Sequence, residues 1–234
     1  MSERTVVLVT GGTGFLGTAV VRAYLEAGAQ VWVNYRDAQK FDRLLQQVET
    51  PENLHGVQAD LSQEESVKAL FAELISRSGH LDVLAHVAGG FWMGGELADT
   101  PMEKLHAMLQ INLLTTFLVT RQAFAIMKTQ NRGVIFTVAS KTAEEFPPGM
   151  GAYSVSKAAV VALTRTLANE GKNYNIRANV ILPGIIDTPA NRAAMPEADT
   201  SAWVTPEEIA SVMVRLSHET AAVNGSLLRM YGKL

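Results

Sequence analysis

Residues 6–17, "VVLVTGGTGFLG", decide the fold. The run of Val and Leu at 6–9 is short and continuous, as is typical of a strand buried on both faces of a parallel sheet. Gly11, Gly14 and Gly17 have the spacing that allows a tight turn, a close approach to a pyrophosphate and packing of a helix on the sheet. Glycines also serve simple turns, but between a strand and a helix they predict a dinucleotide site.

The rest of the chain alternates short β-branched runs with longer helical patterns, which predicts an α/β fold: a doubly wound, Rossmann-type parallel sheet flanked by helices in three layers. We expect the ligand beyond the carboxyl ends of the strands. The predicted strands are 6–9, 31–33, 54–59, 83–87, 134–138 and 178–181. The predicted helices are 15–27, 39–48, 64–78, 102–128 and 153–171.

Length and composition indicate one domain over residues 1–234, with residues 1–90 as mainly the dinucleotide-binding half. The formal net charge is -3 without a basic stripe, so nucleic acid is not an expected partner. There is no cysteine and no close pair among the five histidines, so no metal site is expected. The start does not resemble a signal peptide, and no apolar run is long enough to span a membrane. These features predict a cytoplasmic protein without a membrane partner.

Two capping boxes are expected at helix starts, Ser62 with Glu65 and Thr205 with Glu208. Residues 183–205, which follow the last predicted strand and end at Thr205, form a long irregular stretch rich in Pro and Ala. A segment of this kind in a compact domain is typical of a mobile lid or substrate loop.

The end of the second predicted strand bears on which dinucleotide binds. An acidic residue there accepts hydrogen bonds from a ribose 2′-hydroxyl, whereas an Arg pairs with a 2′-phosphate. Tyr35 holds the acidic position, Arg36 follows it, and Asp37 comes next. This order slightly favours NADP(H) over NAD(H), although Asp37 would repel a phosphate and could itself reach the ribose.

The stretch "GAYSVSKAA", residues 151–159, places Tyr153 and Lys157 four residues apart in a helical pattern. Side chains at this spacing lie on one face, so the phenol and the ammonium would point into the same space. The pair alone is a weak signal, because many amphipathic helices contain it by chance.

Together these stretches resemble the short-chain dehydrogenase/reductase family, single-domain type, over the whole chain and in the family's order. The matching pieces are the turn 10–17, Asp60-Leu61, "AGG" at 88–90, Asn112, Ser140, Tyr153, Lys157 and "PGIIDT" at 183–188.

The resemblance implies roles for these positions. Tyr153 would be the general acid/base, with Lys157 lowering its pKa, Ser140 binding the substrate oxygen and Asn112 completing a proton relay. Cofactor contacts are implied for the turn (Gly11, Gly12, Thr13, Gly14, Phe15, Leu16, Gly17), the adenosine end (Tyr35, Arg36, Asp60, Leu61), the cleft wall (Ala88, Gly89, Gly90, Asn112, Tyr153, Lys157) and the carboxamide end (Pro183, Gly184, Ile186, Thr188).

Some positions depart from the common family pattern. His86-Val87 stands where Asn-Asn is usual, and the last two glycines of the turn are further apart. "DTPANRAAMPEADTSAW", residues 187–203, resembles instead the quinonoid dihydropteridine reductase branch. That branch lacks the equivalents of Ser140 and Asn112, so the main prediction is hydride transfer between nicotinamide and a small carbonyl or secondary alcohol. Two alternatives remain: a quinonoid dihydropteridine reductase-like enzyme, and a non-catalytic nicotinamide-binding redox sensor.

The substrate pocket is expected between residues 90–95, 144–150 and 185–203. Phe91, Trp92 and Met93 could pack the loop, contact a subunit or stack on a flat substrate, and Arg192 could bind an acidic group or cover the surface. The final stretch, residues 223–234, resembles the family's last strand and tail, which implies a homotetramer or homodimer.

Overall fold

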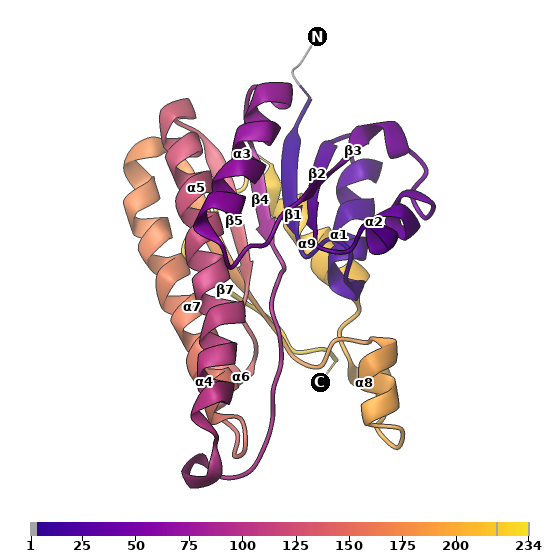
Figure 1. The fold of residues 1–234 in the computed structure, drawn as a ribbon, viewed down its shortest axis with the longest axis vertical. Helices are drawn as coiled ribbons and strands as arrows, with labels where there is room; N and C mark the ends of the chain where they lie inside the picture. Colours follow the sequence, from indigo (N-terminus) through magenta and orange to yellow (C-terminus); the bar gives the residue numbers. More distant parts are fainter. Residues whose placement is uncertain (1–3, 219, 234) are drawn as a thin grey trace.

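The structure is a computed structural model that describes residues 4–218 and 220–233 (Figure 1). Its strands form one parallel sheet in the order β3-β2-β1-β4-β5-β6-β7. The strands are β1 (Val6–Thr10), β2 (Gln30–Tyr35), β3 (Leu54–Gln58), β4 (Val83–His86), β5 (Gly133–Val138), β6 (Ile176–Pro183) and β7 (Leu227–Met230). The helices are α1 (Phe15–Glu26), α2 (Ala38–Leu45), α3 (Glu64–Ser78), α4 (Met102–Met108), α5 (Thr115–Gln130), α6 (Thr142–Glu145), α7 (Gly151–Glu170), α8 (Pro189–Ala194) and α9 (Pro206–Ser217).

Helices cover both faces of the sheet, which confirms the predicted doubly wound, three-layer architecture (Figure 1). One buried cluster joins the sheet to α1, α2 and α9, and another joins it to α3, α5 and α7. Successive residues of β1 alternate between the two: Val7 belongs to the first cluster and Leu8 to the second. Because both faces are buried, every position of this strand is protected from water, which is why its sequence is continuously apolar.

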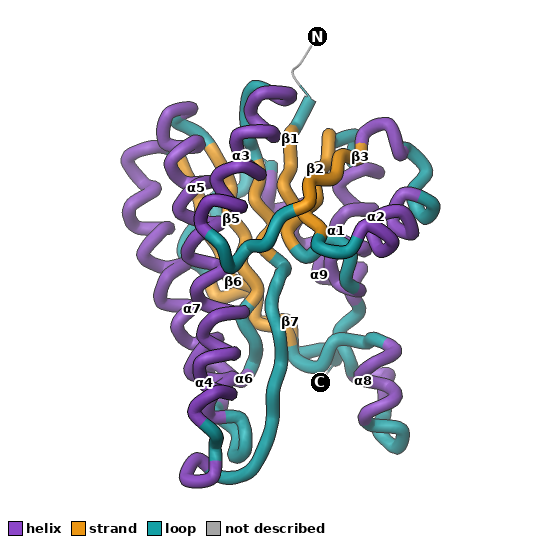
Figure 2. The backbone as a smooth tube through the Cα atoms, in the orientation of Figure 1, coloured by secondary structure: helices purple, strands orange, loops and turns teal. Residues whose placement is uncertain are grey.

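The strand order reverses direction between β1 and β4, since β2 lies on one side of β1 and β4 on the other. In open α/β sheets the crevice at such a switch point, beyond the carboxyl ends of the strands, is where ligands bind. Figure 2 shows that the long connection from β4 to α4 and the segment that carries α8 both extend beyond this edge of the sheet. The fold therefore gathers its loops around one end of β1 and β4.

The single helix predicted over 102–128 is interrupted. Between α4 and α5 the chain forms a π-helical segment, Leu109–Leu114, which contains Asn112. A π turn inserts one extra residue into an α-helix and is frequent at functional sites. Periodicity does not reveal it, because the apolar pattern continues on both sides.

One of the two predicted capping boxes is wrong. The N-cap of α3 is Gln63, without a side-chain bond, and Ser62 instead donates from its hydroxyl and its N–H to Asp60 Oδ1, at 2.8 and 2.9 Å. The box at Thr205 and Glu208 is confirmed. The Ser62 hydroxyl therefore bonds the local turn at Asp60 instead of the backbone at the start of α3.

The segment 183–205 is more ordered than the sequence predicted. It contains α8, whose N-cap Thr188 accepts a hydrogen bond from Asn191 N–H, and a bridge that pairs Ile186 with Val204. The chain end packs against it, because Lys233 N–H donates to Ala202 O at 3.1 Å. This segment is thus tied at several points.

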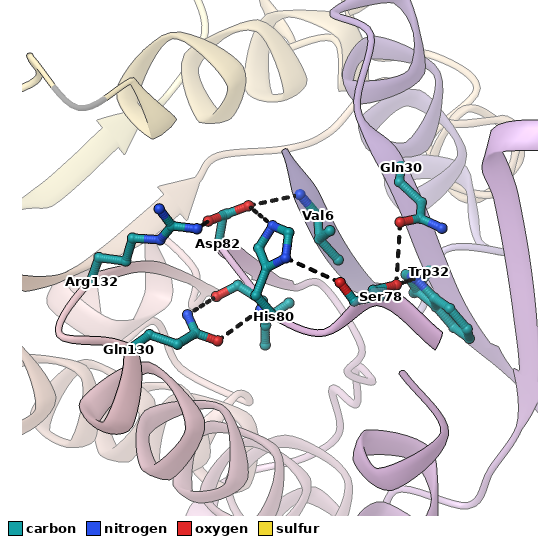
Figure 3. Close-up of polar contacts among 9 residues, drawn as sticks. Val6, Gln30, Trp32, Ser78, His80, Asp82, Gln130 and Arg132 are labelled. Carbon is teal, nitrogen blue, oxygen red and sulfur yellow. Dashed lines mark hydrogen bonds and ion pairs between the residues drawn. The ribbon is translucent and has the colours of Figure 1, made fainter. Parts of the chain in front are cut away.

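At the other end of the sheet, a polar network joins the amino-terminal ends of the central strands (Figure 3). Asp82, just before β4, accepts from Val6 N–H at 2.9 Å and pairs with His80 at 3.0 Å and Arg132 at 3.3 Å. Nearby, Trp32 Nε1 donates to Ser78 Oγ at 2.8 Å. Charge-assisted bonds of this kind fix the amino-terminal ends of β1 and β4, so the network around His80 and Asp82 stabilises the fold. Among the described helices, none combines the length and apolarity needed to cross a membrane.

Candidate active site

A cleft of about 720 Å³ opens beyond the carboxyl ends of β1 and β4. Most of the predicted cofactor contacts from the first half of the chain line it. They are Gly11, Thr13, Gly14, Phe15, Leu16, Gly17, Tyr35, Arg36, Asp60, Leu61, Ala88 and Gly89. The sequence analysis missed further lining residues from β2, α2, α4, the π-helical segment, the start of α5 and loops. They are Asn34, Lys40, Ser62, Val87, Ala107, Gln110, Ile111 and Thr115.

The Gly-rich turn fits a dinucleotide, because two of its glycines cannot carry a side chain. A Cβ on Gly17 would lie 2.1 Å from Gly11 O, and one on Gly11 would lie 2.8 Å from Ala88 N. Gly11 also has a φ of +70°, which disfavours other residues. Gly14 caps α1 without a side-chain bond, so the first turn of the helix offers its N–H groups to the cleft. Gly12 differs in role, since its Cβ would strike Val33 in the core.

Two cations and two carboxylates lie at the adenosine end of the cleft. Arg36 and Lys40 line the cleft, while Asp37 turns its carboxylate to the N–H of Gln39 as the N-cap of α2. Hydrogen bonds from Ser62 and then the charge of Arg36 lower the pKa of Asp60, which places that guanidinium close to the carboxylate. The carboxylate of Asp37 is thus engaged in capping, and the lining at this end carries two cations against the one carboxylate of Asp60.

Ser140, Tyr153 and Lys157 come together as the sequence predicted. The Lys157 ammonium lies 5.9 Å from the centroid of the Tyr153 ring and donates to Val138 O at 2.9 Å. Helix α7 supplies both side chains from one face, and Ser140 follows β5 directly. Ser140 Oγ accepts from Thr142 N–H and Oγ1, at 3.2 and 3.1 Å, which fixes its orientation.

Burial dominates the electrostatics of this group. It raises the pKa of the Tyr153 phenol, and a hydrogen bond from the Ser140 hydroxyl acts in the opposite direction. Burial also lowers the pKa of Lys157 from 10.5 to about 8. The resemblance implied that Lys157 lowers the pKa of the phenol, whereas in this structure burial is the largest influence and holds that pKa above its ordinary value.

Asn112 clamps the loop that follows β4. Its Oδ1 accepts from Gly90 N–H at 2.8 Å, and its Nδ2 donates to Gly90 O at 3.1 Å and to Ser156 Oγ at 3.0 Å. Ser156 in turn donates to the carbonyl of Tyr153 at 2.7 Å. A Cβ on Gly89 would lie 2.8 Å from Asn112 Oδ1, so the loop approaches as closely as glycine allows. The amide therefore joins the cleft wall to the helix that carries Tyr153.

His86, which departs from the family pattern, is a buried neutral group. Its Nδ1 lies 2.8 Å from Thr10 Oγ1 across the paired strands. Burial, and then the charge of Lys157, lower the pKa of this imidazole to about 3. It is uncharged at neutral pH and joins β1 to β4 through a hydrogen bond.

The residues predicted for the carboxamide end lie outside the lining of the cleft. Pro183 ends β6, and Gly184 packs so closely on Tyr231 that a Cβ would lie 2.9 Å from its carbonyl oxygen. Ile186 and Thr188 hold the segment 183–205 in shape, through the bridge to Val204 and the cap of α8. Gly90, Asn112, Tyr153 and Lys157 are not part of the lining either, although Asn112 and Lys157 lie directly behind Gly89 of the cleft wall.

The aromatic loop and Arg192 also have defined positions. The Phe91 ring meets the Tyr153 ring edge to face at 5.0 Å between centroids. Arg192 forms two bonds to Asp187, at 2.6 and 2.7 Å, so its charge is already paired. Among the described residues, no group of three or more His, Cys, Asp or Glu side chains is arranged to hold a metal ion.

Known proteins share both the sequence and the fold. The family model for short chain dehydrogenase matches residues 5–199. An uncharacterised oxidoreductase, YvrD of Bacillus subtilis (strain 168), is 30% identical and covers 98% of this chain and 96% of its own. The acetoacetyl-CoA reductase of Acinetobacter sp. (strain RA3849) is 31% identical, covering 100% and 99%.

Among solved structures, ElxO with NADP bound superimposes with a TM-score of 0.92 at 26% identity, covering 98% of each chain. None of these proteins is named as a dihydropteridine reductase, so the similarity of residues 187–203 to that branch stays a prediction. The match of the family model over most of the chain, together with relatives aligned from end to end, shows that this protein is an oxidoreductase of the short-chain dehydrogenase/reductase family.

Proposed function

We propose that the protein transfers hydride between NADP(H) and a small carbonyl or secondary alcohol, with Tyr153 as the general acid/base. The observation that carries the proposal is the convergence of Ser140, Tyr153 and Lys157 beside the dinucleotide cleft. When bound, the nicotinamide supplies or accepts the hydride. The chain's own residues bind the substrate oxygen and manage its proton.

In the reducing direction the Tyr153 phenol donates its proton to the carbonyl oxygen as that oxygen becomes an alkoxide. Burial raises the pKa of Tyr153 above its ordinary value, so the phenol is protonated at neutral pH and has a proton to donate in this direction. Ser140 shares the substrate oxygen, and its own orientation is held by Thr142. The Lys157 ammonium stabilises the phenolate that remains after the proton has left.

NADP(H) is the cofactor that the adenosine end favours. Arg36 and Lys40 can both reach a 2′-phosphate there, and Tyr35 at the end of β2 leaves no carboxylate in the position that binds a 2′-hydroxyl. The capping role of Asp37 removes the main objection from the sequence, because its charge is partly neutralised by the helix start.

Replacing Arg36 by Ala should raise the Kd for NADPH by about tenfold or more, since a charge-assisted bond to phosphate is worth about 1.5–3 kcal/mol. The Kd for NADH should change by less than about twofold. Both are measured by fluorescence titration of the purified protein. Arg43→Ala, on α2 just after Arg36 in the chain, is the matched control, because that side chain bonds Gln39 O and lies outside the cleft lining. A wild-type protein that binds NADH more tightly than NADPH would contradict the assignment.

A quinonoid dihydropteridine substrate is the second candidate, and the sequence of residues 187–203 is what favours it. Turnover of quinonoid dihydropterin beside a panel of aldehydes and ketones, with the preferred cofactor, decides between the two. Carbonyl turnover without pterin turnover supports the proposal. Pterin turnover equal to or above the best carbonyl would overturn it and leave Ser140 without a function in the reaction.

We also propose a cytoplasmic homodimer or homotetramer. Leu114 and Phe117 expose apolar side chains on the α5 side of the molecule, and burying such groups between copies would stabilise an assembly. Size-exclusion chromatography with light scattering measures the mass in solution.

A further inference from the structure

Exposed apolar side chains surround the approach to Tyr153. Phe91 is 62% exposed although its ring contacts the catalytic phenol, and Met93 and Leu97 are 58% and 78% exposed. Phe146, which lies between Ser140 and Tyr153 in the sequence, is 61% exposed. Large apolar groups at a binding cleft are the surface that an apolar ligand covers.

These side chains are held against the start of α7. Gly94 N–H donates to Gly149 O at 2.9 Å, which joins the loop after β4 to the loop before Tyr153. A Cβ on Gly149 would lie 3.9 Å from Met93, and one on Gly151 would lie 3.1 Å from Leu97 Cδ1. The apolar groups therefore form one wall that ends at the phenol. A molecule covering this wall also reaches the catalytic hydroxyl.

Three segments that follow the carboxyl ends of β4, β5 and β6, the end of the sheet at which Tyr153 lies, carry an excess of negative charge. Residues 90–101 contain two acidic side chains and no basic one, residues 141–150 two against one, and residues 183–205 three against one. The cations of the last two segments are paired: Lys141 with Glu145 at 3.0 Å, and Arg192 with Asp187. Arg229, which reaches this region from β7, forms two bonds to Glu144. These pairs neutralise the three cations together with Glu144, Glu145 and Asp187. The acidic residues that remain in the three segments are Glu96, Asp99, Glu197 and Asp199. An anionic substrate would meet their like charge.

We infer that the substrate is an uncharged carbonyl compound with an apolar, ring-sized group beside the reacting carbon, and that Phe91 packs against that group. This inference rests on the proposed function and narrows it. The wall supplies the apolar contact, while the acidic segments disfavour carboxylates and phosphorylated carriers such as coenzyme A thioesters. Specificity then comes from attraction to one class and repulsion of another.

Three ketones test the inference with the wild-type enzyme and its preferred cofactor. Methyl 4-acetylbenzoate is neutral and aromatic, 4-acetylbenzoate carries the same ketone with a negative charge, and butanone has no ring. We expect kcat/KM for the methyl ester to exceed that for each of the other two by about tenfold or more. A carboxylate turned over as well as or better than the ester overturns the inference and leaves the proposed function intact. The absence of turnover for every carbonyl, despite NADPH binding, overturns both.

Two variants separate protein recognition from the intrinsic reactivity of the ketones. Phe91→Ala should lower kcat/KM for the methyl ester about tenfold more than kcat/KM for butanone, whereas Val155→Ala, an exposed apolar residue on α7, should leave the ratio of the two unchanged. Glu96→Lys combined with Asp99→Lys should raise kcat/KM for 4-acetylbenzoate several-fold relative to the ester. An ester-to-carboxylate ratio that is unaffected by the double charge reversal, or a Phe91→Ala variant that loses ester and butanone equally, overturns the inference.

Discussion

Tyr153→Phe is expected to reduce kcat by about a thousandfold, because a positioned general acid contributes about 10²–10⁴ to the rate. The substitution removes only the hydroxyl and keeps the ring, so the edge-to-face contact with Phe91 at 5.0 Å should survive. NADPH binding should therefore remain within about twofold of the wild type, since the contact and the helix are retained. Steady-state kinetics with the best carbonyl, together with a cofactor titration, provide the measurement.

Tyr174→Phe is the matched control for this variant. That tyrosine follows α7, and its ring contacts Phe124 and Lys128 on α5; none of these three residues lines the cleft. Its loss of a hydroxyl should leave kcat unchanged. If Tyr153→Phe retained a tenth or more of the wild-type kcat, the phenol would not be the proton donor. If the wild type bound NADPH but turned over no substrate, that result would favour the alternative of a non-catalytic redox sensor.

Lys157→Met is expected to lower the activity strongly and to raise the free energy of unfolding at pH 7. Activity should fall by about 100-fold or more, because the ammonium that stabilises the phenolate is gone. In the folded protein burial lowers the pKa of Lys157 from 10.5 to about 8, so keeping it charged at pH 7 costs about 3 kcal/mol. Methionine removes that cost but leaves the Val138 carbonyl without its donor, which takes back about 1–2 kcal/mol. The net gain in the free energy of unfolding is about 1–2 kcal/mol.

The pH dependence checks the cause of this stabilisation. Between pH 8 and 10.5 the unfolded chain still holds the Lys157 proton while the folded protein has released it, so wild-type stability rises with pH in this window. The advantage of Lys157→Met should therefore shrink from pH 7 to pH 10 in urea unfolding experiments. Lys172→Met, which removes an exposed lysine bonded to Asn169, should show no such trend. A Lys157→Met variant that is markedly less stable than the wild type at pH 7 would contradict the account.

Much of the fold could be predicted because its determinants are local. Buried parallel strands such as β1 are written as continuous apolar runs, and the Gly11 turn marks the first βα junction. Boundaries and caps were less certain, since hydroxyls have several possible acceptors. Ser62 bonds Asp60 rather than capping α3, and the sequence gives no measure of which interaction is stronger.

The sequence predicted which residues the structure brings together around Tyr153, but not the environment of each side chain. The spacing of Tyr153 and Lys157 places them on one face, yet the pKa of each depends on how deeply the fold buries it. Lys40 was missed because only the turn from β2 into α2 brings it to the cleft. The pairing of Arg192 with Asp187 lies within one short helix and its flank, where the i to i+5 spacing is no standard helical pair.

The π turn that holds Asn112 has a consequence for how this chain can vary in length. One residue of an α-helix corresponds to about 100° of rotation, so deleting a residue from 109–114 would turn the amide away from Gly90 or expose the core face of α5. Insertions and deletions should thus be excluded from this segment in related proteins that keep the clamp. A one-residue gap at this point in a relative would mark a protein that has given up the clamp, whatever else its sequence retains.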